Sequence, residues 1–435
     1  MLESLHLKNV GPASEMTMEL APRLNLITGD NGLGKSFLLD VAWWALTRKW
    51  PHDLNPRLTS GYPARPTENT RPATIAFQLN TGRTKPARYE SSYDLRQQGW
   101  IGKAGRPLNP GLVLYSHADG GFAVWDPARN YWTKSGGIDI QERQPGYVFS
   151  PKDVWEGLRV DLEGRSTVAC NGLIADWANW IRERGVAAER MQELLNRMSP
   201  SGEPIQIGPL IRLTLEDVRD IPSIHTSYAP AVPILHASSG LRRIAGLTYM
   251  LLWSWNEHVR ASELLGKRPT NQVVLLFDEL ENHLHPKWQR TILRSLLHVA
   301  EALRTDAEIQ LIAATHSPLI LASAEPFFDR SIDAWFDLDL IGKDIVLQKR
   351  DFVQRGDVSN WLTSEAFDLR EPRSVEAEQA IIKALEVLRN PEPSADDVAS
   401  VDEGLRSTLS DIDRFWVRWS AFREQLNDQR RRPIA

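Results

Sequence analysis

The stretch Gly29–Ser36 reads GDNGLGKS and matches the pattern G-x-x-x-x-G-K-[ST]. In this pattern, small and flexible residues let the main chain curl around a polyphosphate, so that backbone N–H groups donate to its oxygens. Lys35 adds a point charge, and the Ser36 hydroxyl adds a ligand for Mg²⁺. ATP with Mg²⁺ is therefore the predicted cofactor pair. The residues expected to bind the nucleotide are Gly29, Asp30, Asn31, Gly32, Leu33, Gly34, Lys35, Ser36 and Phe37.

The residues on both sides of this loop support the same interpretation. Before it, residues 24–28 (LNLIT) form an apolar run that is typical of a buried strand. After it, residues 37–44 (FLLDVAWW) predict a helix that is packed on most sides. A strand, a glycine-rich loop and a helix, in this order, are the context in which the pattern binds phosphates. The predicted fold class is therefore α/β.

A second cluster follows another apolar run. Residues 273–277 (VVLLF) precede Asp278 and Glu279, as expected for a central parallel strand that delivers carboxylates to its carboxyl edge. Asp278 is expected to hold Mg²⁺ through water. Glu279 is expected to orient and activate the attacking water. The alternative for an Asp-Glu pair, an exposed strand end, is less favoured because the P-loop is present in the same chain.

A third strand is predicted at residues 310–314, and it leads into the sequence Thr-His-Ser-Pro. His316 stands where a sensor of the γ-phosphate would be, although a single histidine after a strand is more often structural. Residues 285–303 carry apolar side chains at helical spacing, so the order is strand, helix, strand, and the sheet is predicted to be parallel. The catalytic residues expected from these motifs are Lys35, Glu279 and His316.

Together with residues 237–243 (ASSGLRR), these motifs resemble the ABC-type ATPase head of the SMC-like and OLD-like branch. The resemblance implies that Ser238 and Gly240 form a signature at a helix N-terminus, facing the γ-phosphate held by another subunit. It thus implies at least a dimer of heads with two ATP molecules between them. Ser239 and Leu241 stand where glycine and glutamine are common in the family. A plain helix N-cap is the alternative for this segment.

The resemblance also suggests how the chain is organised. Residues 1–350 are predicted to form the head, with a mixed central sheet, an antiparallel β lobe at about 61–150 and a helical insertion at about 151–235. Strands are expected at residues 74–79, 112–116 and 121–125, with no coiled coil. Residues 351–435 are predicted to be a helical interaction region. A Mg²⁺-sensing glutamine is implied as well, and the candidates are Gln78, Gln97, Gln98, Gln141 and Gln144.

Two features bear on partners of the chain. The last predicted helix carries Phe415, Trp416, Trp419 and Phe422 beside arginines, which suits either a protein interface or docking onto the chain's own core. A basic stretch at residues 65–106, with tyrosine and tryptophan interleaved, could contact nucleic acid, but a solvated surface loop is favoured.

Length, charge and cysteine content restrict the class of protein and its expected location. The chain has 435 residues, a formal net charge of −5 and 25% charged residues, which argues against a protein that coats nucleic acid. A single cysteine, Cys170, excludes an internal disulfide framework. The first residues lack a secretory signal, and the longest apolar-rich stretch is shorter than a membrane span. A cytoplasmic protein with no membrane contact is the expectation.

The compact head, the Thr-His-Ser-Pro segment and the residues at 362–367 and 373–378 resemble bacterial antiphage ATPases of the Septu and retron-associated kind. This resemblance implies an ATP-hydrolysing sensor that regulates a separate toxic effector, such as a nuclease, in a toxin–antitoxin-like manner. One alternative is a DNA-repair or DNA-end-processing SMC-like ATPase. Another is a nucleotide-switch scaffold with little hydrolysis. A transporter engine is disfavoured because such heads usually carry a fuller signature.

Overall fold

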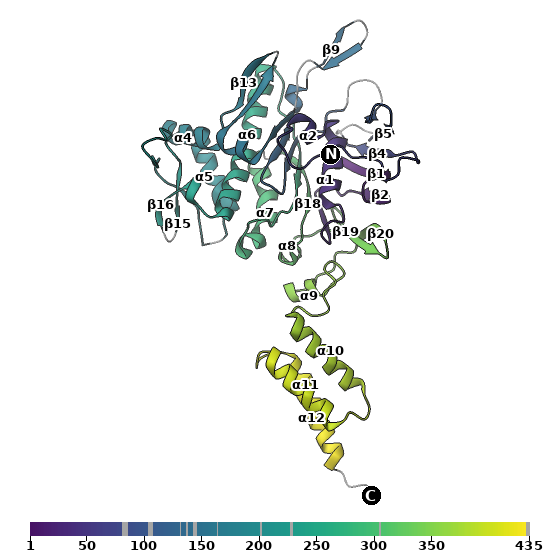
Figure 1. Ribbon diagram of the computed structural model, residues 1–435. Coiled ribbons are helices and arrows are strands. Elements are labelled where there is room, and N and C mark those ends of the chain that lie inside the picture. The colour runs from purple at the N-terminus through teal and green to yellow at the C-terminus, as the bar shows by residue number, and fades with distance from the viewer. Residues whose placement is uncertain are drawn as a thin grey trace. The chain divides into compact units, whose positions relative to one another are not determined.

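The computed structural model divides the chain into two compact units, Met1–Gly356 and Asp357–Ala435 (Figure 1). Within the described residues, no helix is long and apolar enough to cross a bilayer. The residues described are 1–80, 86–102, 108–130, 132–135, 138–141, 146–162, 164–200, 202–226, 229–303 and 306–431.

The larger unit is built on an eight-stranded sheet with the order β11-β8-β7-β17-β18-β3-β19-β20. Its five middle strands are parallel, and the outer ones pair antiparallel with their neighbours. Every residue of β17 is buried, as expected for a strand covered on both faces. The predicted mixed α/β sheet is confirmed. The strands are β3 (Leu24–Gly29), β7 (Leu112–Ser116), β8 (Phe122–Trp125), β11 (Gly146–Phe149), β17 (Gln272–Phe277), β18 (Glu308–Ala314), β19 (Asp333–Ile341) and β20 (Asp344–Arg350).

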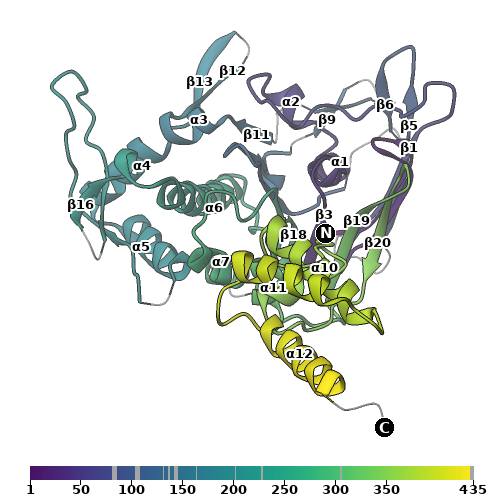
Figure 2. The ribbon, with the colours of Figure 1, turned by 60° about the horizontal axis from the view of Figure 1, so that its bottom comes forward.

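A second, antiparallel sheet has the order β2-β1-β4-β5-β6. Helix α1 (Lys35–Thr47) shares one hydrophobic core with both sheets, in which Trp43 and Trp44 join Phe77 of β4 and Leu276 of β17. The P-loop helix is thereby fixed between the two sheets (Figure 2). The strands are β1 (Leu2–Val10), β2 (Ala13–Glu19), β4 (Thr74–Leu79), β5 (Ala87–Asp94) and β6 (Gly99–Ile101).

The longest helix of the larger unit is α6 (Ser239–Leu264), whose middle is buried almost continuously. Ser238 caps its N-terminus by accepting a hydrogen bond from the Leu241 N–H at 3.3 Å. Helices α5 and α7 pack against each other, and α7 also packs on β18. The remaining helices here are α2 (Pro51–Leu54), η1 (Pro127–Arg129), α3 (Pro151–Glu156), α4 (Leu173–Glu183), α5 (Val186–Met198), η2 (Ile234–His236), α7 (Pro286–Leu303) and α8 (Pro318–Ala324).

Two parts of the predicted organisation differ from the structure. Strand β7 is not in the same sheet as β4: it pairs antiparallel with β8 but in parallel with β17, because all five of its residues are buried and it lacks the alternation of a half-exposed strand. Residues 151–235 are not wholly helical, because short antiparallel pairs alternate there with helices. The strands are β9 (Trp132–Ser135) and β10 (Ile138–Gln141) before this segment, and within it β12 (Leu158–Leu162), β13 (Arg165–Cys170), β14 (Gln206–Ile207), β15 (Ser223–Thr226) and β16 (Ala229–Pro233).

The smaller unit is helical, with its own hydrophobic cluster around Ile381, Leu405 and Trp419. Trp419 is fully buried, and its indole N–H donates to Asp402 at 2.9 Å. The aromatic side chains of the last helix therefore pack partly within their own unit, while Val417 is 77% exposed. The helices are α9 (Val358–Leu362), α10 (Val375–Arg389), α11 (Ala395–Thr408) and α12 (Phe415–Arg431).

Candidate functional site

The P-loop joins β3 to α1 in a conformation that needs glycine. Gly29 has φ 129°, and a Cβ there would lie 2.3 Å from the Leu338 carbonyl oxygen. Gly34 has φ 105°, and a Cβ there would lie 2.7 Å from Pro12. Both positions are therefore closed to larger residues by space and by backbone conformation. Asp30, Asn31 and Gly32 are exposed at the outer side of the loop, and Leu33 is buried beneath it.

Lys35 is folded back onto this loop. Its ammonium donates to the Gly29 carbonyl at 2.7 Å and to the Asp30 carbonyl at 2.8 Å, and the residue is only 6% exposed. Burial lowers the pKa of Lys35 to about 8, although Asp278 and other nearby carboxylates oppose that shift. A desolvated cation whose hydrogen bonds go to backbone carbonyls is well suited to receive an anionic ligand.

Ser36 and Asp278 meet at the carboxyl end of β17, where Ser36 hydrogen-bonds the Asp278 carboxylate. Burial raises the pKa of Asp278 to about 6, and the Ser36 hydrogen bond and the Lys35 charge counteract part of that rise. The two residues predicted to hold Mg²⁺ are thus adjacent, and a hydroxyl with a carboxylate is a donor set that suits this ion. The donor chemistry fits Mg²⁺.

The raised pKa of Asp278 gives a pH-dependent prediction. Mg²⁺ requires the carboxylate, so the Mg²⁺-dependent gain in ATP affinity should fall as pH drops through about 6, by about tenfold per pH unit below that value. Calorimetric titrations with ATP between pH 5 and 8, with and without Mg²⁺, measure this gain. The Asp278→Asn variant is the control and should show little gain at any pH. An equal pH dependence in that variant would rule out Asp278 as its source.

The ends of β17 and β18 are tied together by Glu281. Its carboxylate accepts hydrogen bonds from the Thr315 hydroxyl at 2.6 Å and the His316 N–H at 2.5 Å. Burial, and then the Lys35 charge, lowers the pKa of the half-buried His316, so its imidazole is neutral at neutral pH. Glu279 adopts φ 48°, a conformation that is uncommon outside glycine, and its carboxylate interacts electrostatically with Lys35. No local pattern in the sequence marks Glu281 as the residue that joins these two strand ends.

Ser238 and Gly240 begin α6 on the outside of the head. Ser238 is exposed and borders a cavity of about 360 Å³ whose wall includes His225 and Trp288. A Cβ at Gly240 would lie 2.8 Å from the His283 carbonyl oxygen. Gly240 therefore has a role within its own subunit: it lets the start of α6 approach the segment that follows Glu279.

The loop after β7 is the main element that the sequence did not reveal. It starts beside Asp278, whose N–H donates to the Ser116 carbonyl at 3.0 Å. Arg243 of α6 donates through one nitrogen to the Ser116 hydroxyl at 3.0 Å and to the His117 carbonyl at 3.1 Å. Asn282 donates to the Ala118 carbonyl at 2.8 Å. This loop thus links the helix that starts at Ser238 to the carboxylate edge of the sheet.

Three of the glutamines considered as Mg²⁺ sensors lie on the antiparallel sheet. Gln78 donates to Glu3 at 2.7 Å, and Gln97 and Gln98 lie in the turn between β5 and β6. Gln144 and the side chain of Gln141 lie outside the described residues. None of these glutamines lies in the loop beside Asp278, which carries Ser116 and His117. The fully apolar run at 112–115, so similar to the one at 273–277, was the signal that could have located it.

We predict that Arg243→Met lowers ATP turnover about tenfold while ATP affinity changes by less than about threefold. The substitution keeps the aliphatic packing but removes the donor that joins α6 to Ser116, and an unpaired buried polar group is costly. Turnover assays and calorimetry on the same protein separate the two quantities. Arg190→Met, at an exposed position of α5, is the matched control and should behave like the wild type. Equal losses in both variants would contradict the assignment.

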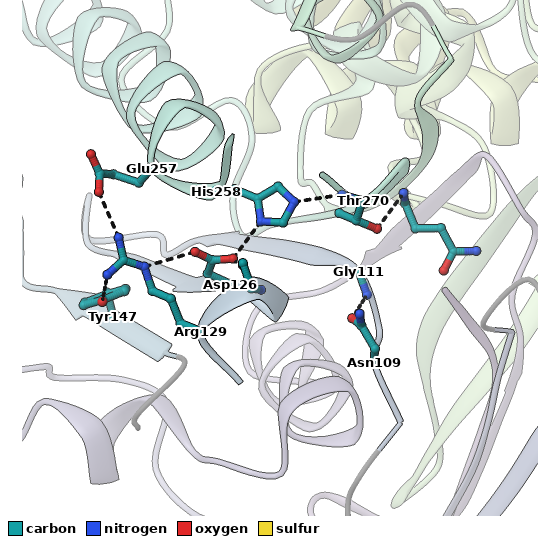
Figure 3. A network of polar contacts seen from close by, with 10 residues as sticks. Asn109, Gly111, Asp126, Arg129, Tyr147, Glu257, His258 and Thr270 are labelled. Carbon is teal, nitrogen blue, oxygen red and sulfur yellow. Dashed lines mark hydrogen bonds and ion pairs between the residues drawn. The ribbon is translucent and has the colours of Figure 1, made fainter. Parts of the chain in front are cut away.

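The other end of α6 is anchored by the network in Figure 3. His258 Nε2 accepts from the Thr270 N–H at 2.9 Å, so Nδ1 carries the proton and donates to Asp126 at 2.7 Å. Arg129 joins Asp126, at 3.1 Å, to Glu257 of α6, at 2.9 Å. Buried networks of this kind fix the position of a helix. Helix α6 is therefore held to the sheet at both ends.

Among the described residues, no group of three or more histidine, cysteine, aspartate or glutamate side chains could hold a metal ion. His283 and His285, which stand two residues apart, therefore have no third ligand of these types within that part of the chain.

Comparisons with known proteins show which chains this one is similar to. The Retron Vc95 probable ATPase of Vibrio cholerae serotype O1 biovar El Tor is 46% identical over 50 residues, which are 12% of this chain and 9% of that protein. The SMC head domain from Thermotoga maritima shares 14% identity with a TM-score of 0.39, over 80% of this chain and 99% of that one. The recombination mediator protein RecF shares 14% identity with a TM-score of 0.37, over 81% and 98%.

A family model described as AAA domain, putative AbiEii toxin, Type IV TA system matches residues 24–322, which is more than half of the chain. That range runs from the first residue of β3 to the helix that follows His316. The chain therefore belongs to this family of AAA-domain proteins.

Proposed function

We propose that this protein binds ATP with Mg²⁺ at its P-loop, hydrolyses it as a homodimer, and regulates a separate toxic effector in a bacterial defence system. The observation that carries the proposal is the meeting of Lys35, the Ser36–Asp278 pair and His316 at the carboxyl ends of three adjacent parallel strands. Ligands of open α/β sheets bind at this edge.

Each residue has a distinct task in this proposal. Lys35 exchanges the carbonyls of its own loop for phosphate oxygens, while Ser36 and Asp278 hold the Mg²⁺. ATP supplies the phosphoryl group that water attacks, and Glu279 orients that water and accepts its proton. The neutral imidazole of His316 donates a hydrogen bond to the terminal phosphate. Catalysis by positioning and charge of this kind needs no covalent intermediate.

The second subunit enters through the start of α6. A helix N-terminus presents free N–H groups and partial positive charge, and this one is exposed at Ser238. We place it against the γ-phosphate held by the other copy. ATP then favours the closed dimer because it binds that state more tightly than the open one. Arg243 passes the change to the loop beside Asp278 within the same subunit.

The regulatory role has two supports. The short match to a retron ATPase covers only 9% of that protein, so it suggests the biological setting and leaves the effector to experiment. The helical unit from Asp357 onward is separate from the ATPase unit and exposes apolar side chains, among them Ile412 at 91% and Val417 at 77%. A separate helical unit with exposed apolar residues is a reasonable place to hold a partner protein.

Two substitutions of Ser238 test the dimer. Aspartate and asparagine are both good N-caps, so Ser238→Asp and Ser238→Asn should keep α6 intact and differ only in charge. We expect the aspartate to repel the partner's γ-phosphate, to abolish ATP-driven dimerisation and to lower turnover at least about tenfold. The asparagine should retain both within about threefold. Analytical ultracentrifugation with ATP and Mg²⁺ checks this, and identical behaviour of the two variants would refute the proposed trans contact.

A further inference from the structure

We propose a second binding site on the ATPase unit, for a lysine or arginine side chain carried by an extended segment of a partner protein. The site is a cavity of about 230 Å³ between the end of β13, helix α4 and the C-terminal half of α6. This volume lies below the roughly 300–1,000 Å³ of pockets that hold drug-sized ligands, so a single side chain is the suitable occupant. The lining residues that matter here are Val168, Cys170, Asp176, Trp180, Trp253 and Glu257.

The charge of the cavity favours a cation. Asp176 is only 9% exposed, and its carboxylate accepts hydrogen bonds from two neutral groups, the Asn171 amide and the Tyr249 hydroxyl, both at 2.8 Å. Glu257, by contrast, is already paired with Arg129 at 2.9 Å and with Arg260 at 3.2 Å. The Arg260 side chain is 70% exposed. A nearly buried carboxylate bonded to neutral donors attracts a cationic group.

The aromatic walls suit the same occupant. Trp180 follows Asp176 by one turn of α4, and its ring lies 5.8 Å from that of Tyr249. Trp253 is fixed edge-on against Phe149 at 5.3 Å. Guanidinium and ammonium groups bind favourably over indole faces, most strongly where water is excluded. Two positioned indoles and a carboxylate that line the same cavity are the parts of a receptor for a basic side chain.

The strand at the rim explains why the side chain should come from an extended segment. Among the described strands, β13 pairs only with β12, and the two form a ribbon at the edge of the unit in Figure 2. Its residues Arg165–Val168 are exposed. A strand with one neighbour can accept a second strand, and side chains of the added chain would alternate above the rim of the cavity. This inference does not rest on the ATPase mechanism.

The test uses two pentapeptides on the full-length protein without nucleotide. They are acetyl-Thr-Val-Arg-Val-Thr-amide and the same sequence with citrulline, the neutral isostere of arginine. Calorimetry measures affinity, and ¹⁹F spectra of protein labelled with 5-fluorotryptophan, with the Trp180 signal assigned by Trp180→Phe, locate binding. We expect the arginine peptide to bind at least tenfold more tightly and to shift the Trp180 signal.

Variants decide between the cavity and the general surface. Trp180→Leu and Asp176→Asn should each weaken the arginine peptide at least fivefold, with melting curves checking that both remain folded. Asp161→Asn, which removes an exposed carboxylate of β12, should bind as the wild type does. Equal affinity for the two peptides, no binding at millimolar concentration, or an unchanged affinity in Trp180→Leu overturns the proposal. Spermidine binding as tightly as the arginine peptide would also overturn it, in favour of a free polyamine.

Discussion

Glu279→Gln should lower ATP turnover by at least about 100-fold and hold the protein as an ATP-loaded dimer. The amide keeps the size of the side chain but cannot accept a proton from water, and general-base catalysis contributes roughly 10²–10⁴-fold. Binding is expected to persist, because Lys35 and the Ser36–Asp278 pair are unchanged. Single-turnover assays measure the chemical step, and size-exclusion chromatography with ATP and Mg²⁺ measures the dimer.

The double variant Lys35→Gln with Glu279→Gln is the control for that trap, since it should remain a monomer with ATP. A wild-type protein that does not turn over, and that Glu279→Gln leaves unchanged, would favour a nucleotide switch with little hydrolysis. Stimulation of wild-type turnover by DNA ends would favour the DNA-repair alternative. The same assay thus separates the three functions.

Lys35→Gln should weaken ATP binding at least about 100-fold and at the same time stabilise the protein without nucleotide. The neutral amide can still donate to the carbonyls of Gly29 and Asp30, so the loop should keep its shape. What is lost is the charge that faces the phosphates, which acts strongly in a partly desolvated site. Calorimetric titration with ATP and Mg²⁺ measures the affinity.

The stability effect has a defined pH range. The pKa of Lys35 falls to about 8 in the folded protein because of burial, so below that pH the native state holds an unfavourable charge. Since a pKa unit corresponds to 1.36 kcal/mol, Lys35→Gln is expected to add about 1–3 kcal/mol to the free energy of unfolding at pH 7. The gain should shrink as pH rises from about 8 toward the ordinary lysine value. A constant gain across this range would exclude the buried charge as its cause.

The two expected effects of Lys35→Gln, weaker ATP binding and higher stability, mean that the charge of Lys35 favours binding and lowers stability. A cation that is poorly solvated in the absence of ligand costs stability, and it is ready to bind a polyphosphate without further reorganisation. Glu279 has a left-handed backbone conformation, which is costly for a residue other than glycine. The hydrogen bond from the Leu280 N–H to the Ala314 carbonyl, at 3.2 Å, holds the chain in this conformation.

The sequence alone is enough to predict the parallel core and the residues around the P-loop. The run at 273–277 is apolar on both faces and the one at 24–28 is mostly apolar, and this pattern identifies central strands without knowledge of their neighbours. The pattern at Gly29–Ser36 is local as well, because the loop's shape depends on its own glycines. The roles of Glu279, His316 and Ser238 remain predictions that the experiments above test.

Which distant segments reach this site follows from the packing of whole elements. Three contacts join parts of the chain that no local pattern relates. They are the pairing of β7 with β17, the contact of Arg243 with Ser116, and the hydrogen bonds of Glu281 to residues 315 and 316. The cavity around Asp176 is also assembled from a strand and two helices. Such contacts depend on how whole elements pack. The burial of a side chain and its partners are set by its neighbours in three dimensions, and only indirectly by the residues adjacent to it in sequence.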